Sequence, residues 1–180
     1  MNCDPAEEKR IFLIGYRGTG KTTTGRILAE MLGYAFLDTD QMVEKKCAMS
    51  ISRIVEQKGW DFFRKMEKQV LLTALDAENC VIATGGGIVI DPENILFVKS
   101  SGVVVWLSAP VAVIVSRIAG DMKSADTRPS FTDKDIEEET CFVLGQRSPL
   151  YRQAADFEIN TSLDNAANMA EKIKRRIYGR

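Results

Sequence analysis

Gly15-Tyr16-Arg17-Gly18-Thr19-Gly20-Lys21-Thr22 is the stretch of this 180-residue chain that decides its fold, because it matches the pattern GxxxxGK[ST] at every fixed position. The stretch follows a short apolar run, Arg10 to Ile14, and opens a helical pattern that begins at Lys21. Glycines let successive backbone N–H groups turn toward phosphate oxygens, and the helix N-terminus adds the positive end of its dipole. The sequence therefore predicts a phosphate-binding loop between a strand and a helix. The alternative is a glycine-rich turn that binds nothing.

The chemistry expected of this loop is divided among its residues. Lys21 is expected to reach the β- and γ-phosphates of ATP, and the Thr22 hydroxyl to ligate Mg²⁺. The other expected nucleotide contacts are Gly15, Gly18, Thr19, Gly20 and Thr23. The loop alone does not separate kinases from GTPases or motor ATPases. The chain has no NKxD motif for guanine recognition, however, and it is too short for a large ATPase machine.

The rest of the chain alternates short runs rich in β-branched residues with longer helical patterns, which predicts an α/β fold with a parallel sheet. The expected strands are Arg10 to Ile14, Ala35 to Leu37, Cys80 to Ala83, Val103 to Leu107 and Phe157 to Asn160. The expected helices are Lys21 to Met31, Gln41 to Cys47, Ile51 to Gln57, Trp60 to Ala77, Pro92 to Lys99, Val111 to Ile118, Asp133 to Ala155 and Asp164 to Tyr178. Asp91 and Thr132 are placed to cap helix starts, and Gly33 and Gly59 to end helices.

The composition indicates one globular domain over residues 1–180, with 45% hydrophobic and 27% charged residues. The formal net charge is -1, so no overall field attracts nucleic acid or anionic lipid. The absence of histidine excludes His-based triads and His-ligated zinc. The four cysteines form no CxxC pair, the first eight residues are acidic, and no apolar run approaches ~18 residues. We expect reduced thiols, a cytoplasmic location and no membrane span.

Two carboxylates, Asp38 and Asp40, follow the second expected strand. Ligands of open α/β sheets bind at the carboxyl ends of the strands, and alternation along a strand would send both side chains to one side. One carboxylate could then hold the Mg²⁺ shell while the other accepts a hydroxyl proton. In the alternative interpretation, Asp40 only caps the next helix.

Further candidates for binding an anion stand later in the chain. Glu67 stands three residues after Arg64 on an expected helix and could fix its guanidinium group, although a surface salt bridge would have the same sequence. Gly85-Gly86-Gly87 after the third strand would bring backbone N–H groups close to a ligand, although a simple turn could also use them. Arginine forks suit oxyanions, and Arg117, Arg128 and Arg147 are further candidates, each of which could instead be solvated.

The ordered set GxxxxGKT, DTD, FRxxE, GGG, RP and RxPLY, from about Arg10 to Tyr178, resembles the shikimate kinases, which are small P-loop kinases related to nucleoside monophosphate kinases. The resemblance implies transfer of the ATP γ-phosphoryl group to the 3-hydroxyl of shikimate, with Mg²⁺, in chorismate and aromatic amino-acid synthesis. It implies a three-layer fold with a five-stranded parallel sheet in the order 2-3-1-4-5. It also implies a substrate-binding region near 38–67. The polar segment 119–132, long for a loop, would be a mobile lid.

On the nucleotide side, the resemblance assigns Asp38 to Mg²⁺, through water. Arg128 would be a catalytic lid arginine that also contacts the nucleotide at the transferring phosphoryl group, and Arg117 would stack on adenine. On the acceptor side, Asp40 would bond the shikimate hydroxyls and could act as base. The other acceptor residues it implies are Phe63 beside the ring, Arg64 and Arg147 on the carboxylate, and Gly85, Gly86 and Gly87 along the pocket.

Two positions depart from the family pattern: Trp60 stands where an acidic residue is usual, and the lid sequence from Arg128 to Asp133 is atypical. A runner-up activity is another small-molecule kinase of this fold, such as a gluconate kinase. A rival of a different class is a catalytically silent domain that senses nucleotide or shikimate. The partners expected are the small molecules shikimate and ATP, without nucleic acid, membrane or an obligate protein partner, and the chain is expected to act as a monomer.

Overall fold

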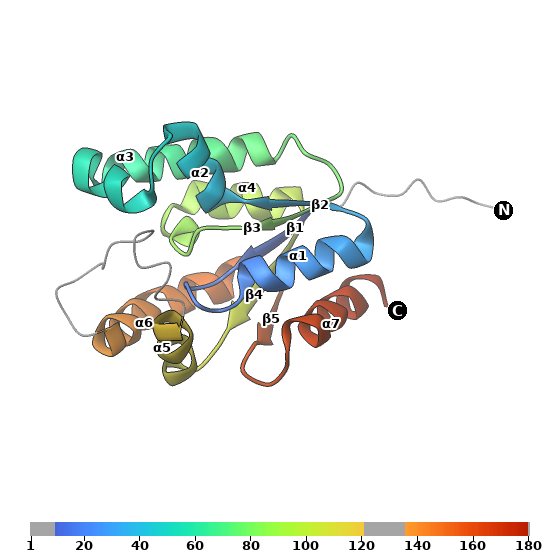
Figure 1. Cartoon of the computed structure of the whole chain (residues 1–180). Helices are drawn as coiled ribbons and strands as arrows, with labels where there is room; N and C mark the ends of the chain where they lie inside the picture. The colour runs from blue at the N-terminus through green and yellow to red at the C-terminus, as the bar shows by residue number, and fades with distance from the viewer. Residues whose placement is uncertain (1–9, 121–135, 180) are drawn as a thin grey trace.

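The computed structural model of the chain describes residues 10–120 and 136–179, which form a five-stranded parallel sheet covered by helices on both faces (Figure 1). The strands are β1 (Arg10–Ile14), β2 (Ala35–Asp38), β3 (Cys80–Ala83), β4 (Val103–Ser108) and β5 (Phe157–Asn160). They pair in the order β2-β3-β1-β4-β5, each neighbour parallel. The predicted strands and their order are confirmed.

The helices are α1 (Lys21–Leu32), α2 (Thr39–Cys47), α3 (Ile51–Ala74), α4 (Pro92–Ser101), α5 (Val111–Gly120), α6 (Ile136–Ala154) and α7 (Ala166–Tyr178). A short 3₁₀ turn that the sequence pattern did not indicate, η1 (Ile88–Ile90), follows the glycine run. None of the helices in the described ranges is long and apolar enough to cross a membrane.

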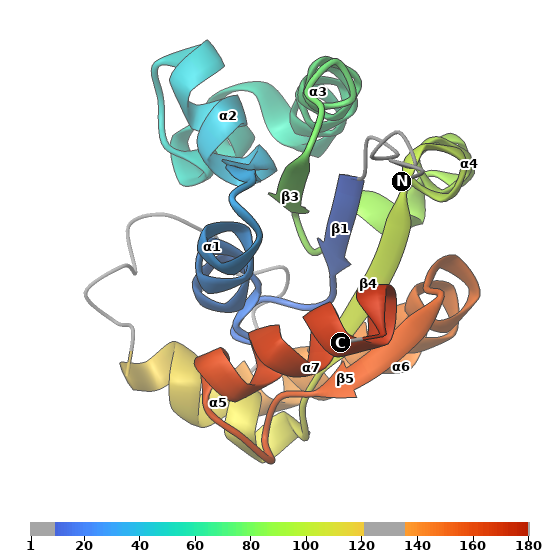
Figure 2. The same ribbon diagram turned by 90° about the vertical axis from the view of Figure 1, so that its right-hand side faces the viewer.

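The core is two layers of side chains, one on each face of the sheet. Ile11 and Leu13 of β1 pack on α1 and α7, whereas Phe12 and Ile14 pack toward α3, α4 and α6. Figure 2 shows α1 and α4 on opposite sides of the strands. Because both faces of β1 are buried from Ile11 to Ile14, these four residues are all apolar instead of alternating with polar ones. This rigid strand fixes the start of the phosphate loop.

Helices α2 and α3 lie side by side near β2, which is an edge strand of the sheet (Figures 1 and 2). They share a small core of their own, which includes Val43, Ile54 and Phe63. Helix α3 is kinked at Gly59, whose φ of 80° and ψ of 169° are not helical. The predicted break at Gly59 is confirmed, and the kink directs the second half of α3, with Phe63, along the glycine run.

Several predicted helix ends can be compared with the structure. Gly33 closes α1 with a φ of 66°, and the Asp91 carboxylate accepts the Glu93 N–H at 2.9 Å to cap α4, as predicted. The Thr132 cap lies outside the described residues. The expected lid does too, apart from residues 119 and 120, which end α5.

Candidate active site

The phosphate loop curls between β1 and α1 on glycines that no other residue could replace without strain. Gly15, Gly18 and Gly20 all have positive φ angles, and a Cβ at Gly15 would lie 2.3 Å from the Leu107 carbonyl oxygen. The Lys21 ammonium donates to the carbonyl oxygens of Gly15 and Tyr16 at 2.8 Å each. The loop therefore holds a buried positive charge inside its own curl, at the N-terminus of α1.

Asp38 connects the phosphate loop to α2. The Thr22 hydroxyl donates to Asp38 Oδ2 at 2.9 Å, and Asp38 Oδ1 accepts the N–H groups of Asp40 and Gln41 at 3.1 and 3.3 Å. Asp38, and not Asp40, is thus the residue that caps α2. This corrects the alternative interpretation of Asp40 as the cap, and it explains why α2 begins at Thr39, two residues before the expected start.

Because α2 begins at Thr39, the prediction that strand alternation places Asp38 and Asp40 on one side of a strand is wrong. Strand β2 ends at Asp38, so strand alternation does not extend to Asp40, which lies in the first turn of the helix. Asp40 still reaches the pocket described below, because the turn folds it against the glycine run. A Cβ built on Gly85 would lie 2.8 Å from Asp40 Oδ1, and the Gly85 N–H donates to Thr39 Oγ1 at 2.9 Å.

A pocket opens between the phosphate loop, α2, α3, the glycine run and α6. Its charged lining combines two acidic residues, from α2 and α3, with three arginines from the phosphate loop, α3 and α6. The lining residues are Tyr16, Arg17, Asp40, Ile51, Trp60, Phe63, Arg64, Glu67, Gly86, Gly87 and Arg147. Six of the seven predicted acceptor residues are brought together here. The seventh, Gly85, is not part of the lining, but a Cβ built on it would lie 2.3 Å from Glu67 Oε1 and 2.8 Å from Asp40 Oδ1, so it packs close to both side chains.

Arg64 is held on its side of the pocket by a buried carboxylate. Its Nη1 lies 2.6 Å from Glu67 Oε2, and the Glu67 side chain is only 2% exposed. Burial raises the pKa of the Glu67 carboxyl, while Arg64 and more weakly Arg147 oppose the rise. The predicted pair is confirmed, and it is not a surface salt bridge. Trp60 and Phe63 also flank Arg64, with ring centroids 5.4 and 5.2 Å from its Cζ, so the atypical Trp60 packs on an arginine of the pocket.

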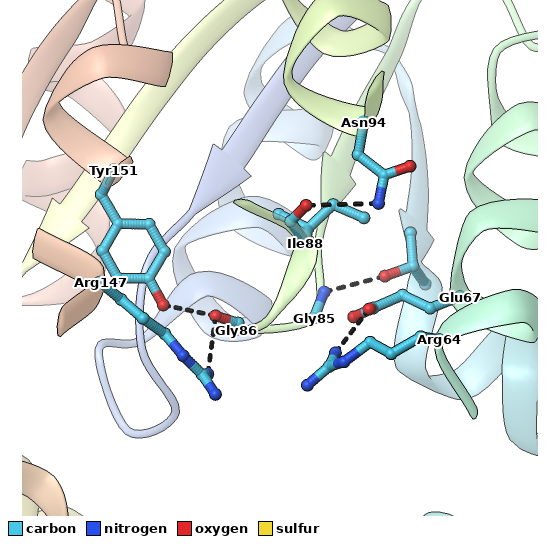
Figure 3. Close-up of polar contacts among 9 residues, drawn as sticks. Arg64, Glu67, Gly85, Gly86, Ile88, Asn94, Arg147 and Tyr151 are labelled. Carbon is cyan, nitrogen blue, oxygen red and sulfur yellow. Dashed lines mark hydrogen bonds and ion pairs between the residues drawn. The ribbon is translucent and has the colours of Figure 1, made fainter. Parts of the chain in front are cut away.

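Arg147 is fixed on the opposite side of the glycine run, as Figure 3 shows. Its Nη1 donates to the Gly86 carbonyl at 3.1 Å, and the Tyr151 hydroxyl donates to the same oxygen at 2.5 Å. Burial raises the pKa of Tyr151, so this hydroxyl keeps its proton at neutral pH. Arg64 and Arg147, 83 positions apart in sequence, thus face one pocket from α3 and α6.

Arg117, on α5, contacts both the phosphate loop and the segment after β5. Its guanidinium donates to Gly18 O at 3.3 Å, to Thr161 Oγ1 at 2.9 Å and to Thr161 O at 2.6 Å. These contacts tie α5 to the loop and to the turn after β5. Stacking on adenine remains a prediction, and Arg128 lies outside the described residues.

The oxygens of Thr22 and Asp38 fit a small hard cation. Magnesium is usually held by one or two carboxylates together with substrate phosphates and water, and not by an all-protein cage. The described part of the chain accordingly holds no cluster of three or more His, Cys, Asp or Glu side chains that would suit a metal. A hydroxyl and a carboxylate 2.9 Å apart, beside the phosphate loop, are the donors that such a site requires.

The comparisons with known proteins agree on one family. The sequence model described as "Shikimate kinase" matches residues 17–178. A shikimate kinase of Syntrophus aciditrophicus is 43% identical over 178 residues, covering 94% of this chain and 91% of the relative. A shikimate kinase of Nitratidesulfovibrio vulgaris is 44% identical over 150 residues, covering 83% of this chain and 85% of the relative. The structure of the Acinetobacter baumannii shikimate kinase in complex with shikimate superposes with a TM-score of 0.90 at 37% identity, covering 96% of this chain and 94% of that one. The chain belongs to the shikimate kinase family.

Family membership makes the chain an ATP-dependent kinase and confirms the resemblance read from its motifs. The three-layer fold of shikimate kinases is present throughout the described residues, and the sheet order agrees with it. The matched range, 17–178, spans both the end of the phosphate loop and the arginines of the pocket. Neither alternative activity gains support from the relatives.

Sequence reasoning did not identify Arg17, Glu139 or Tyr151 as parts of the site. Tyr151 belongs to the RxPLY motif, which could have marked it. Arg17 occupies a variable position of the phosphate loop, and Glu139 is one of three consecutive glutamates at the start of α6, so neither carries a local signal.

Proposed function

We propose that this chain transfers the γ-phosphoryl group of ATP to the 3-hydroxyl of shikimate, giving shikimate 3-phosphate and ADP for chorismate and aromatic amino-acid synthesis. The pocket carries the proposal, because Asp40 lines it together with the two fixed arginines, Arg64 and Arg147, and with residues of the phosphate loop. A carboxylated polyol needs these partners: an acceptor for its hydroxyl protons and a cationic fork for its carboxylate. The complex of the 37% identical Acinetobacter enzyme with shikimate supports the same acceptor here.

On the nucleotide side, the backbone of the loop and Lys21 would bind the phosphates, and Arg117 would pack on adenine. Thr22 and Asp38 would hold Mg²⁺. When bound, this ion would neutralise charge on the phosphate oxygens. Arg128 would meet the transferring group from the segment 119–132, which we expect to close over the site as a lid.

On the acceptor side, Asp40 would orient the 3-hydroxyl and take its proton as the phosphoryl group arrives. Arg64 and Arg147 would bind the carboxylate, and each is held in advance, the first by Glu67 and the second by the Gly86 carbonyl. Holding the donors before binding lowers the cost of ordering them. Phe63 would pack beside the ring, and Gly85, Gly86 and Gly87 leave room for it.

The organisation of the chain as one domain over 1–180, with a substrate-binding region near 38–67, remains a prediction. The same holds for a monomeric state, a cytoplasmic location and the absence of protein, nucleic-acid or membrane partners.

A panel of acceptors tests the proposed function. With Mg-ATP, we expect ADP release with shikimate and only background release with gluconate, AMP or CMP. The residues that line the acceptor pocket suit a small ring with hydroxyls and a carboxylate, and we assign none of them to a nucleobase. Coupled detection of ADP, together with mass analysis of the product, measures this. Equal or faster turnover of gluconate would overturn the choice of acceptor.

Gly87→Ala tests the carboxylate clamp without removing either arginine. A Cβ at Gly87 would lie 2.1 Å from Arg64 Nη1, so the guanidinium must leave its position. Because a charge-assisted contact contributes about 1.5–3 kcal/mol, kcat/KM for shikimate should fall about tenfold or more. Gly145→Ala, where a Cβ meets nothing within 4 Å, is the matched control.

The same variant can be assayed with the acceptor whose carboxylate is reduced to an alcohol. If Arg64 serves the carboxylate, Gly87→Ala should cost far less with the alcohol than with shikimate. An equal loss with both acceptors would mean that Arg64 is structural or serves ATP.

A further inference from the structure

A buried ion pair joins the phosphate loop to α6, and none of the roles above uses it. Arg17 Nη2 lies 2.5 Å from Glu139 Oε1, and the two side chains are 13% and 1% exposed. The Tyr16 hydroxyl lies 3.5 Å from the same carboxylate oxygen, and the Arg17 guanidinium lies 5.7 Å from the centre of the Tyr16 ring. The pair spans 122 positions of sequence.

Stability alone is a poor reason for such a pair. Taking two charges out of water costs several kcal/mol per ion, and apolar residues of similar volume often serve the fold as well or better. Glu139 gains some support from its place in the first turn of α6, where the helix dipole favours a negative charge. The remaining cost suggests that the guanidinium is needed where Glu139 holds it.

The position of Arg17 indicates what it is needed for. Arg17 lines the acceptor pocket together with Asp40, Arg64 and Arg147, yet its backbone belongs to the phosphate loop. A Cβ on Gly86 would lie 3.6 Å from Arg17 N, so the glycine run packs on the loop at this residue. Arg17 is therefore the arginine of the pocket that comes from the phosphate loop, on the side from which a phosphoryl group would arrive.

We propose that Glu139 is a positioning residue that holds the Arg17 guanidinium at the junction of the two substrate sites, where it contacts the phosphoryl group on the acceptor. This inference rests on the proposed function and adds a third arginine to it. Arg64 and Arg147 bind the carboxylate of the acceptor, which the reaction does not change. Arg17 faces the 3-hydroxyl, which gains negative charge when it becomes a phosphate ester. Helix α6 positions arginines at both ends of the acceptor, because it carries Arg147 itself and also Glu139, the carboxylate that holds Arg17.

The test compares four variants of the full chain with wild type. They are Arg17→Gln, Glu139→Gln, the double variant with both changes, and the control Glu137→Gln, which alters an exposed glutamate in the same helical turn. Titration calorimetry gives the Kd values of shikimate, shikimate 3-phosphate and ADP, thermal unfolding gives Tm, and steady-state assays separate kcat from KM.

We expect Arg17→Gln and Glu139→Gln to weaken shikimate 3-phosphate binding about tenfold, and shikimate binding by less than about threefold, with the Kd of ADP unchanged. A loss confined to the phosphorylated acceptor is not a result that general loosening of the fold would give. Glu137→Gln should match wild type throughout.

The double variant separates positioning from stability. Each single change breaks the ion pair but keeps one of its charges buried, and it should lower Tm, whereas the two amides of the double variant can bond each other and restore Tm. Affinity for shikimate 3-phosphate should remain as weak as in Arg17→Gln. If affinity returns together with Tm, the pair is only structural and the proposal is wrong. Should a single variant fail to fold, the double variant alone decides between these outcomes.

Failure of this inference differs from failure of the proposed function. If wild type does not phosphorylate shikimate, both fall. If wild type turns over shikimate but the three variants bind shikimate 3-phosphate as tightly as the control, only the role of Arg17 and Glu139 falls.

Discussion

Lys21→Ala is expected to lower kcat for shikimate phosphorylation by about a hundredfold or more while the protein remains folded. Phosphoryl transfer relies mostly on positioning and on charges aimed at the transferring group, and a group of this kind is typically worth about 10²–10³ in rate. The ammonium of Lys21 is held by the backbone of the phosphate loop, since it donates to the carbonyl oxygens of Gly15 and Tyr16.

These two hydrogen bonds also give Lys21 a part in shaping the loop, so folding must be measured beside activity. Circular dichroism and thermal unfolding should show a native sheet, because the core on both faces of β1 does not include Lys21. Lys65→Ala, which removes an exposed lysine from α3, is the matched control and should retain full activity. Retention of more than about a tenth of the wild-type rate in Lys21→Ala would contradict the assigned role.

The parts of the fold that were predictable are those in which local pattern and tertiary environment agree. β3 and residues Ile11 to Ile14 of β1 are apolar on both faces because both faces are buried, so the sequence pattern and the burial agree. The phosphate loop was predictable because its glycines must adopt positive φ angles, which fixes residue type at fixed spacing. Gly59 was identified as a helix end for a similar reason.

The parts that were not predictable depend on contacts between distant segments. The start of α2 at Thr39 follows from the capping of this helix by Asp38. The sequence alone allowed Asp38 to be the last residue of the strand without capping a helix, because capping depends on geometry as well as on residue type. Whether Glu67 is buried cannot be read from its spacing to Arg64, because an exposed pair has the same i,i+3 pattern. The pairing of Arg17 with Glu139 leaves no trace in either local sequence.

Asp40→Asn is expected to produce the second large loss, and this loss should fall on kcat. The amide keeps the shape of the carboxylate and can still bond a hydroxyl, but it cannot take up a proton. A positioned general base contributes about 10²–10⁴ in rate, so kcat should fall about a hundredfold or more, with the KM for shikimate and the Kd of Mg-ATP changing much less. Rapid-quench assays of a single turnover would measure the chemical step directly.

Asp38→Asn is the informative comparison, because Asp38 and Asp40 are separated by a single residue yet their carboxylates have different contacts. Asparagine caps helices as well as aspartate does, so α2 should keep its start, while the oxygen facing Thr22 loses its charge. The Mg²⁺ concentration needed for half-maximal rate should therefore rise in Asp38→Asn and stay unchanged in Asp40→Asn. If Asp40→Asn raised the Mg²⁺ requirement and Asp38→Asn lowered only kcat, the two roles would be exchanged. Asp40, which lies against Gly85 inside the pocket, would then be a metal ligand, and the base would have to be sought elsewhere in the lining.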